Sequence, residues 1–382
     1  MEGDFLNFEW DSQSSHILIN PRYPEVDQRF FKRILQDSPF SAHLWLATSG
    51  STVKKWVGLS KQALLNSAEA VNKHLESRST DVWIHTLPDF HVGGVGIWAR
   101  SYMSGAQVKD FKAVSAGKKW EALAFYQFLQ QNQGTLTALV PAQLYDLVQL
   151  GLTAPRHLRA VVIGGGALSE GLYRKAVKLG WPILPSYGLT ECASQVATGK
   201  LGCWENELQI PSMQILPHLH VKEELDGRLS FKGTSLISAY AYYEESSFKW
   251  LDPKVEGWFM SEDQGKKEGT GLQIQGRIDD RVKVGGENVD LFKLEAVLKD
   301  IQLELNLSGS MALVAMGDDR LGHAIHLVMD QISARDEVTV VARFQAQVLP
   351  FEKIRKVHHV PHIPRSSLNK VLKAELLSLI TI

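Results

Sequence analysis

The chain has 382 residues, of which 44% are hydrophobic and 22% are charged, a balance typical of a globular protein with two or three domains. Its 41 basic and 42 acidic side chains nearly cancel, which argues against a nucleic-acid partner or an anionic membrane surface. The two cysteines are too few for a disulfide framework or a cysteine-rich metal site, and they favour a reducing cytoplasm. No apolar run is long enough to span a membrane, so we expect no membrane insertion.

The first forty residues carry no clear pattern, and after them strand and helix signals alternate. The predicted strands cover 43–48, 82–87, 136–140, 158–163 and 181–184, and the predicted helices cover 61–76, a stretch around 120–129 and the segments after Pro141 and Ser169. Such alternation predicts parallel strands with right-handed crossovers. Ligands bind beyond the carboxyl ends of the strands in sheets of this kind. We therefore expect the loops at 48–52, 164–166 and 186–191 to meet in one crevice.

Beyond the alternating region the pattern changes to short strands and turns, with a strong hairpin signal at Asp226-Gly227. Residues 277–280 then read as a hinge, which is followed by a small α+β unit. Its predicted elements are strands at 311–316 and 324–329 and a helix at 338–348. The sequence therefore predicts an α/β protein. A large N-terminal domain, 1–276, holds parallel-type sheets with helices and a β-rich subdomain, and a small, mobile C-terminal α+β domain covers 277–382.

Small, mostly hydroxyl-bearing residues follow the first predicted strand, namely Thr48, Ser49, Gly50, Ser51 and Thr52. Glycine lets the backbone approach a phosphate closely, and backbone amides with hydroxyls can surround its oxygens. The loop is not a Walker P-loop, because no Gly-Lys-Ser/Thr follows at the required spacing. A phosphate-binding loop and a plain surface loop are the two interpretations.

Three consecutive glycines, Gly164, Gly165 and Gly166, follow the strand at 158–163. They favour either a tight turn or a place where a flat ring lies against the backbone.

The most informative segment follows the strand at 181–184 and reads Ser186-Tyr187-Gly188-Leu189-Thr190-Glu191. Its tyrosine ring can stack on a purine. Thr190 and Glu191 can hold phosphate and Mg²⁺, since hard cations prefer oxygen ligands. The alternative is the N-terminus of a helix, with Thr190 as its cap and Glu191 on its dipole.

The order of these segments resembles that of the adenylate-forming superfamily of acyl-CoA synthetases, luciferases and nonribosomal adenylation domains. Five segments between about residues 44 and 372 carry the resemblance. They are 48–52, like the family's phosphate loop; 186–191, like its Tyr-Gly-x-Thr-Glu motif; 257–263, like its Gly-Trp-x-x-Thr-Gly-Asp segment; 276–281 with 284–288, like its hinge and following hairpin; and 364–370, like its terminal Pro-Arg-Thr-x-x-Gly-Lys. Their shared order argues against coincidence.

Within the superfamily the chain resembles the o-succinylbenzoate–CoA ligases of menaquinone biosynthesis, through residues 90–100, 137–144 and 164–166. The resemblance implies that His91 and Arg100 frame one acid pocket. Arginine suits bidentate binding of a carboxylate, and a dicarboxylate needs a second anion partner besides its activated end. The alternative is a surface cation at Arg100 and a core histidine at His91.

The resemblance also implies an activity, namely that of an ATP-dependent carboxylate–CoA ligase that forms an acyl-adenylate, with o-succinylbenzoate as the acid. Its cofactors would be ATP, Mg²⁺ and coenzyme A, and a homodimer is left open. Lys370, Glu191 and Thr190 are the implied catalytic residues, and Glu191 is also the implied Mg²⁺ ligand. The implied nucleotide-binding residues are Thr48, Ser49, Gly50, Ser51, Thr52, Gly164, Gly165, Gly166, Ser186, Tyr187, Gly188, Asp263 and Arg277.

A domain rotation belongs to the same resemblance. The small domain would turn about Asp279, withdraw Lys370 and bring in the hairpin of Gly285 and Gly286, whose glycines leave room for the pantetheine arm of coenzyme A.

The chain departs from the family pattern after Thr52, where Val53-Lys54-Lys55-Trp56 stands in place of the usual Gly-x-Pro-Lys-Gly. Lys54 or Lys55 would then supply the missing lysine. Asn369 replaces the usual glycine before Lys370, and asparagine tolerates left-handed backbone geometry better than most residues. The altered loop is the best support for a non-catalytic nucleotide-binding relative.

Other interpretations concern different chemistry. One is an adenylating enzyme for another aryl or fatty acid, or one that loads a carrier protein instead of coenzyme A. Another is a metal protein using His358, His359 and His362, although no cysteine or acidic ligand accompanies them. Cys192 invites a nucleophile role, but no base can be named for it and a small packing residue is the better interpretation.

Overall fold

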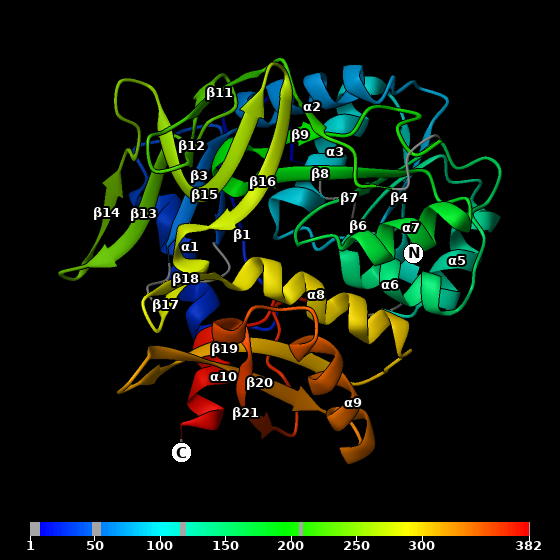
Figure 1. Cartoon of the computed structure of the whole chain (residues 1–382). Helices are drawn as coiled ribbons and strands as arrows, with labels where there is room; N and C mark the ends of the chain where they lie inside the picture. The colour runs from blue at the N-terminus through cyan, green and yellow to red at the C-terminus, as the bar shows by residue number, and fades with distance from the viewer. Residues whose placement is uncertain (1–7, 48–54, 115–119, 206–208, 382) are drawn as a thin grey trace.

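The computed structural model describes residues 8–47, 55–114, 120–205 and 209–381. Three sheets with helices packed around them build the molecule, and the elements from β17 onward gather at one end (Figure 1). Within these ranges, none of the helices is long and apolar enough to cross a membrane.

The largest sheet has 11 strands, and its parallel half confirms the predicted strand–helix alternation. In sheet order the parallel strands are β5 (Gln107–Asp110), β4 (Val82–His85), β6 (Leu136–Leu139), β7 (Ala160–Ile163) and β8 (Ile183–Leu189). The helices between them in the chain are α3 (Val92–Ser104), α4 (Phe111–Val114), α5 (Ala122–Gln131), α6 (Pro141–Gln149) and α7 (Glu170–Lys178). The residues of β6 and β7 are buried throughout, as expected for parallel strands covered by helices on both faces.

The other half of this sheet is antiparallel. Its strands are β9 (Ser194–Thr198), β10 (Met213–Ile215), β16 (Gly271–Arg277), β15 (Phe259–Glu268), β12 (Arg228–Gly233) and β11 (Leu219–Glu223). The hairpin predicted at Asp226-Gly227 is confirmed, because β11 and β12 pair on either side of it. This half forms the β-rich part of the fold.

A second sheet includes the strand predicted at 43–48 and also residues of the first forty, for which the sequence pattern predicted nothing. Its strands are β1 (His16–Leu18), β2 (His43–Ala47), β3 (Trp56–Ser60), β13 (Ala239–Glu244) and β14 (Ser247–Leu251), and the nearby helices are α1 (Glu25–Asp37) and α2 (Lys61–His74). Phe31 and Ile34 of α1 share a buried cluster with Trp45 and Trp56. The early residues therefore fold by packing on aromatic side chains of later strands.

The C-terminal elements form a third sheet with its own hydrophobic cluster. They are β17 (Arg281–Val284), β18 (Glu287–Asp290), α8 (Leu291–Glu304), β19 (Ser310–Asp318), β20 (Gly322–Asp330), α9 (Ala334–Gln345), β21 (Ile354–His359) and α10 (Lys373–Ile380). The helix predicted at 338–348 begins earlier, because the Ser333 hydroxyl caps it by accepting the Asp336 N–H at 3.2 Å.

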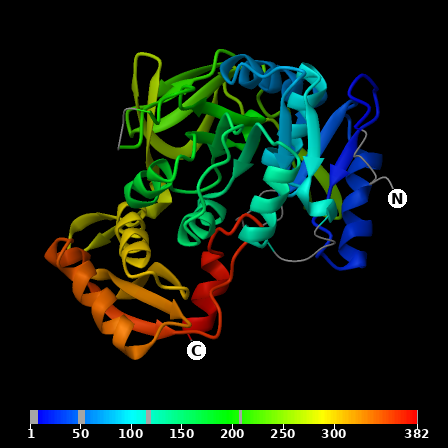
Figure 2. The same ribbon diagram turned by 90° about the vertical axis from the view of Figure 1, so that its right-hand side faces the viewer.

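Figure 2 shows the red segment before α10 reaching from this third sheet toward the rest of the molecule. Leu303 of α8 packs in the core around α6 and α7, so the two parts share hydrophobic contacts. The boundary at residue 276 and the mobility of the C-terminal part remain predictions.

Candidate active site

The motif at 186–191 begins inside a strand, so the prediction that the strand ends at residue 184 is wrong. Beyond Pro185, β8 leaves its parallel partner β7 and pairs antiparallel with β9, which extends it to Leu189. A Cβ atom at Gly188 would lie 1.9 Å from the Ser194 carbonyl oxygen, so this crossing requires glycine. The helix-cap alternative for Thr190 is also wrong, because Thr190–Cys192 is one 3₁₀ turn that leads into β9.

Tyr187 meets two predicted nucleotide-binding residues from the antiparallel half of the sheet. Its hydroxyl donates a 2.7 Å hydrogen bond to Asp263 Oδ2, and Arg277 Nη1 lies 3.4 Å from Asp263 Oδ1. Asp263 and Arg277 are register partners on β15 and β16. Burial and the negative charge of Asp263 raise the pKa of Tyr187 well above its usual value, so the phenol stays protonated.

Glu191 is held by a tyrosine that the sequence analysis missed. Tyr240 of β13 donates a 2.9 Å hydrogen bond to Glu191 Oε1, and the Ile237 N–H donates to the Glu191 carbonyl at 2.7 Å. Burial raises the pKa of Glu191, and the hydrogen bond from Tyr240 opposes this shift. The ammonium of Lys55, one of the two candidate substitute lysines, lies 5.6 Å from the centre of the ring of Tyr240, the tyrosine that holds Glu191.

Lys370 ends a tightly bonded loop. The Ser366 N–H donates to the Lys370 carbonyl at 2.8 Å, and the Lys370 N–H donates back to the Ser366 hydroxyl at 3.2 Å. Asn369 has a φ of 59°, which confirms the expected left-handed geometry. Lys370 is exposed to solvent, but protein atoms surround its ammonium. This surrounding protein lowers the pKa of the ammonium, whereas the negative charges of Asp263 and Glu191 act to raise it.

His91 contacts the same loop. It is the N-cap residue of α3, and its Nε2 lies 2.6 Å from the Ser367 hydroxyl. Burial and the charge of Lys370 lower the pKa of His91 to about 4, so the ring is neutral at physiological pH. His91 therefore joins α3 to the loop that carries Lys370.

Arg100 lies elsewhere on α3. It is 2% exposed, so the surface-cation alternative is wrong. Its Nη2 lies 3.4 Å from the Ser194 hydroxyl, and its guanidinium carbon lies 5.6 Å from the Trp83 ring centre. Burial lowers the pKa of Arg100 to about 10. His91 is nine positions away, about 13 Å along a helix axis, and the two side chains contact different segments.

Four other predicted site residues lie at different distances from the motif at 186–191. Gly164 lies beside the motif, because a Cβ atom there would be 3.4 Å from the Ser186 carbonyl oxygen. Gly285 and Gly286 form the turn between β17 and β18, where the Gly285 N–H donates to the Leu321 carbonyl at 2.8 Å, and this turn contacts neither Tyr187 nor Glu191 in the described hydrogen bonds. Asp279 is exposed in a 3₁₀ turn before β17.

The predicted phosphate loop, Thr48, Ser49, Gly50, Ser51 and Thr52, lies outside the described residues.

Two alternatives from the sequence gain no support. Among the described residues, no group of three or more histidine, cysteine, aspartate or glutamate side chains could hold a metal ion. His358 instead contacts His326, with 3.0 Å between Nε2 and Nδ1, and His359 contacts Glu337 at 2.9 Å. Cys192 is completely buried and burial raises its thiol pKa well above the usual value, which suits a packing residue.

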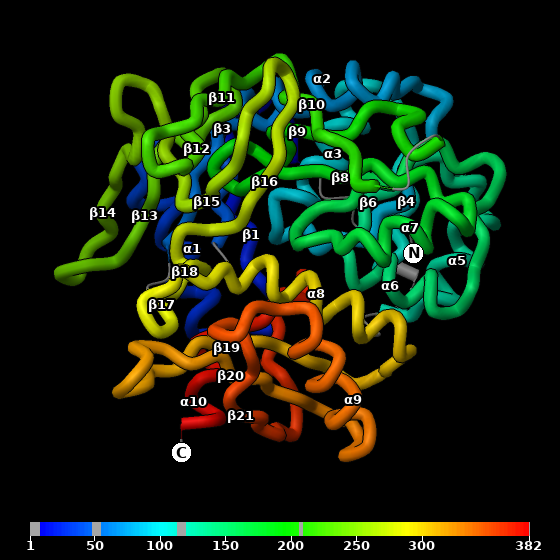
Figure 3. The backbone as a smooth tube through the Cα atoms, viewed as in Figure 1, coloured from blue at the N-terminus to red at the C-terminus, as the bar shows by residue number. Residues whose placement is uncertain are grey.

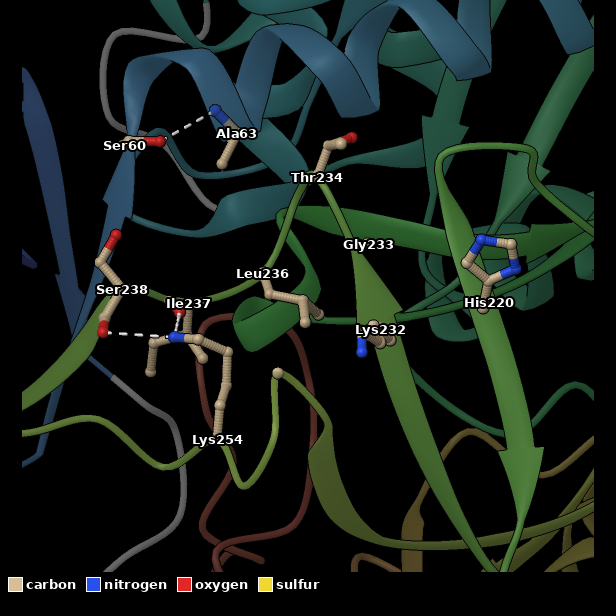
Figure 4. A pocket seen from close by; sticks show the side chains of 11 residues that line it. Ser60, Ala63, His220, Lys232, Gly233, Thr234, Leu236, Ile237, Ser238 and Lys254 are labelled. Atoms are coloured by element: carbon tan, nitrogen blue, oxygen red, sulfur yellow. Dashed lines mark hydrogen bonds between the residues drawn. The ribbon is translucent and has the colours of Figure 1, made fainter.

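A cavity of about 540 Å³ lies at the segment 232–238. Its lining includes Ser60 and Ala63 at the start of α2, and Lys232 and Lys254. Figure 4 shows the Lys254 ammonium turned toward the backbone carbonyls of the segment at 237–238, and the nearer of these contacts is 2.5 Å. None of Tyr187, Glu191, Asp263 and Lys370 lines this cavity, but its lining includes Ile237, whose N–H donates to the Glu191 carbonyl.

Curated proteins resemble this chain in sequence over most of its length. The chain is 26% identical over 349 residues to a 2-succinylbenzoate–CoA ligase of Bacillus cereus, covering 87% of this chain and 69% of that protein. It is 26% identical over 368 residues to the enzyme of the same name from Bacillus pumilus, covering 93% and 73%.

Solved structures agree at the level of fold. The o-succinylbenzoate CoA synthetase of Bacillus subtilis in complex with its acyl-adenylate intermediate matches with a TM-score of 0.75 at 19% identity, covering 97% of this chain and 79% of that one. The same enzyme with ATP and magnesium ion matches with a TM-score of 0.72 at 19% identity, covering 97% and 80%. The family model described as AMP-binding enzyme matches residues 21–226, more than half of the sequence, and the chain therefore belongs to the AMP-binding enzyme family.

Proposed function

We propose that this protein is an AMP-forming ligase that converts o-succinylbenzoate to its coenzyme A thioester through an acyl-adenylate. One observation carries the proposal, namely a polar cluster centred on Asp263. This carboxylate accepts a hydrogen bond from Tyr187 and forms an ion pair with Arg277. The ammonium of Lys370 is close enough to feel the charges of Asp263, Arg277 and Glu191. The names of the relatives support the choice of acid.

In the first step a carboxylate oxygen of the acid attacks the α-phosphorus of ATP, and the bond to pyrophosphate breaks. Negative charge grows on the phosphate oxygens, so catalysis depends on positioning and on placed positive charge. Lys370 offsets that charge. Asp263, oriented by Tyr187 and Arg277, accepts hydrogen bonds from the ribose hydroxyls, since each carboxylate oxygen can accept more than one donor.

Glu191 fits the magnesium ion that such a reaction uses. Tyr240 engages only Oε1 by its 2.9 Å hydrogen bond, and Mg²⁺ typically binds one or two protein carboxylates together with substrate phosphates. The ion would supply positive charge at the phosphate oxygens. Tyr240 orients the carboxylate for this contact.

In the second step the thiol of coenzyme A releases its proton to solvent and attacks the acyl carbon, and AMP leaves with the electron pair of the broken C–O bond. The observed arrangement suits the first step, because Lys370 lies at the site while the Gly285–Gly286 turn is bonded to Leu321. A rotation of the C-terminal elements about Asp279 would withdraw Lys370 from the site and bring in the Gly285–Gly286 turn.

Arg100 is the candidate partner for the second carboxylate of the acid. Its guanidinium is buried, and within the described part of the chain its Nε has no hydrogen-bond partner. A buried cation without an anion is costly, and a substrate carboxylate would relieve that cost.

Pyrophosphate release from ATP and Mg²⁺ tests the function, with o-succinylbenzoate, benzoate and a fatty acid as substrates, with and without coenzyme A. We expect release that depends on o-succinylbenzoate and falls at least 100-fold, an order-of-magnitude expectation for lost charge stabilisation, in Lys370→Ala. Lys299→Ala, on the exposed face of α8, serves as the matched control. Pyrophosphate release with a different acid would refute o-succinylbenzoate as the substrate. No release with any acid from folded protein would favour a non-catalytic relative.

A further inference from the structure

A network of polar side chains lies under the turn that joins β4 to α3. Asp89 Oδ1 lies 2.8 Å from His85 Nε2 and accepts a 2.8 Å hydrogen bond from Trp98 Nε1, and Asp89 Oδ2 accepts a 2.7 Å hydrogen bond from Lys112 Nζ. Lys112 also donates to the Leu87 carbonyl at 2.7 Å. The ammonium thus holds the turn at two points, one on its backbone and one on its side chain.

The side chains of this network are largely shielded from solvent. The His85 side chain is fully buried, and the side chains of Asp89 and Lys112 are 26% and 27% exposed. Burial acts to raise the pKa of Asp89, but the hydrogen bond from His85 and the charge and hydrogen bond of Lys112 outweigh it and hold that pKa well below its usual value. Asp89 is therefore a carboxylate at neutral pH. A partly buried ion pair with several hydrogen bonds contributes more to a defined geometry than to stability.

The network stands directly beside the candidate site. Phe90 and His91 follow Asp89 in the chain, their ring centres are 4.7 Å apart, and His91 Nε2 lies 2.6 Å from the hydroxyl of Ser367. Ser367 belongs to the loop that ends at Lys370. A continuous series of contacts therefore runs from Lys112 through the turn to the Lys370 loop.

We propose that Asp89 and Lys112 are positioning residues, whose ion pair fixes the turn at residues 88–91. Through His91 this turn sets the shape of the acid-binding side of the site and the position of the loop that ends at Lys370. This inference rests on the proposed function. Lys112 follows β5, whereas Asp89 follows β4, and the two strands are parallel neighbours. Their carboxyl ends meet at one edge of the sheet, which brings the two side chains together.

The kinetic test uses Lys112→Met, with Asp89→Asn as a second variant of nearly unchanged shape. We expect the KM for the acid to rise roughly tenfold and the kcat of pyrophosphate release to fall, as for the loss of a hydrogen bond between charged groups. The KM for ATP should stay within about twofold, because Tyr187 and Asp263 are not touched. Lys112→Arg should restore most of the lost activity. Lys109→Met, which changes an exposed lysine of the preceding strand β5, should behave as the wild type.

Hydrogen exchange measures the anchoring without any substrate. The reporters are the backbone amides of His91, Gly94 and Val95, which donate to carbonyls of the turn at 3.1, 3.0 and 3.1 Å. Faster exchange there in Lys112→Met and in Asp89→Asn, together with the selective rise in the KM for the acid, would support the proposal. Unchanged exchange, or equal rises in the KM for acid and ATP, would overturn it. A wild-type protein inactive with every acid would refute the proposed function, whereas the exchange rates still decide whether the pair anchors the turn.

Discussion

The contact between α7 and α8 offers the sharpest test of the proposed rotation. Figure 3 shows α8 between the C-terminal sheet and the helices α6 and α7. Asp300 Oδ1 of α8 accepts the Gly171 N–H in the first turn of α7 at 3.1 Å, and Lys175 of α7 donates to the Leu303 carbonyl in the last turn of α8 at 3.0 Å. Each helix therefore places a charge at the complementary end of the other helix dipole.

The size of the effect follows from these contacts. A carboxylate at a helix N-terminus is worth about 0.3–1 kcal/mol when exposed and up to ~2 kcal/mol when partly buried. Asp300→Ala should therefore shift the conformational equilibrium away from the observed arrangement by roughly fivefold. Gly171→Ala offers a second route, because a Cβ atom there would lie 2.4 Å from Asp300 Oδ1. This variant should gain about 0.5–1 kcal/mol of helix propensity, so it perturbs the contact without weakening α7.

Separate assays of the two half-reactions measure this shift. We expect Asp300→Ala and Gly171→Ala to slow pyrophosphate release about fivefold, while formation of the thioester from prepared acyl-adenylate is unchanged or faster. Asp319→Ala, in an exposed turn of the same part of the molecule, is the control. Equal losses in both half-reactions, or no change in either, would show that the contact does not hold the adenylation arrangement and would refute the reasoning.

The remaining predictions concern single residues. Gly188→Ala should lower the free energy of unfolding by about 3 kcal/mol or more, because the new Cβ atom would lie 1.9 Å from a backbone carbonyl oxygen of β9. Gly317→Ala should be nearly neutral in the same denaturant titration, because a Cβ atom there would meet no described residue within 4 Å. Lys55→Met should raise the KM for ATP several-fold, since Lys55 lies over the Tyr240 ring beside the candidate Mg²⁺ ligand; an unchanged KM would contradict this role. Burial lowers the pKa of His218 from 6.5 to about 4, so the unfolded state binds the proton more readily, and stability should fall as the pH drops through that window. His218→Gln should flatten this fall in unfolding curves recorded between pH 7 and 4.5.

Features with a local cause were predictable from the sequence. The alternation of apolar strands and helices determined the parallel half of the sheet, Asp226-Gly227 determined a hairpin, and Asn369 adopts the left-handed geometry that its residue type tolerates. The order of the motifs indicated the family. Each of these signals depends on residues within a few positions of one another, or on their order along the chain, so the amino-acid sequence is enough to read them.

Only the tertiary structure decided which side chains meet. Tyr240 reaches Glu191 across 49 residues, Lys112 reaches Asp89 across 23, and Asp300 reaches the first turn of α7 across 129. The length of β8 likewise depends on β9, because a strand continues for as long as a neighbour offers hydrogen bonds. Contacts of this kind are set by the order of strands in a sheet and by the packing of one unit on another, and neither is encoded in the residue types at the two positions that touch.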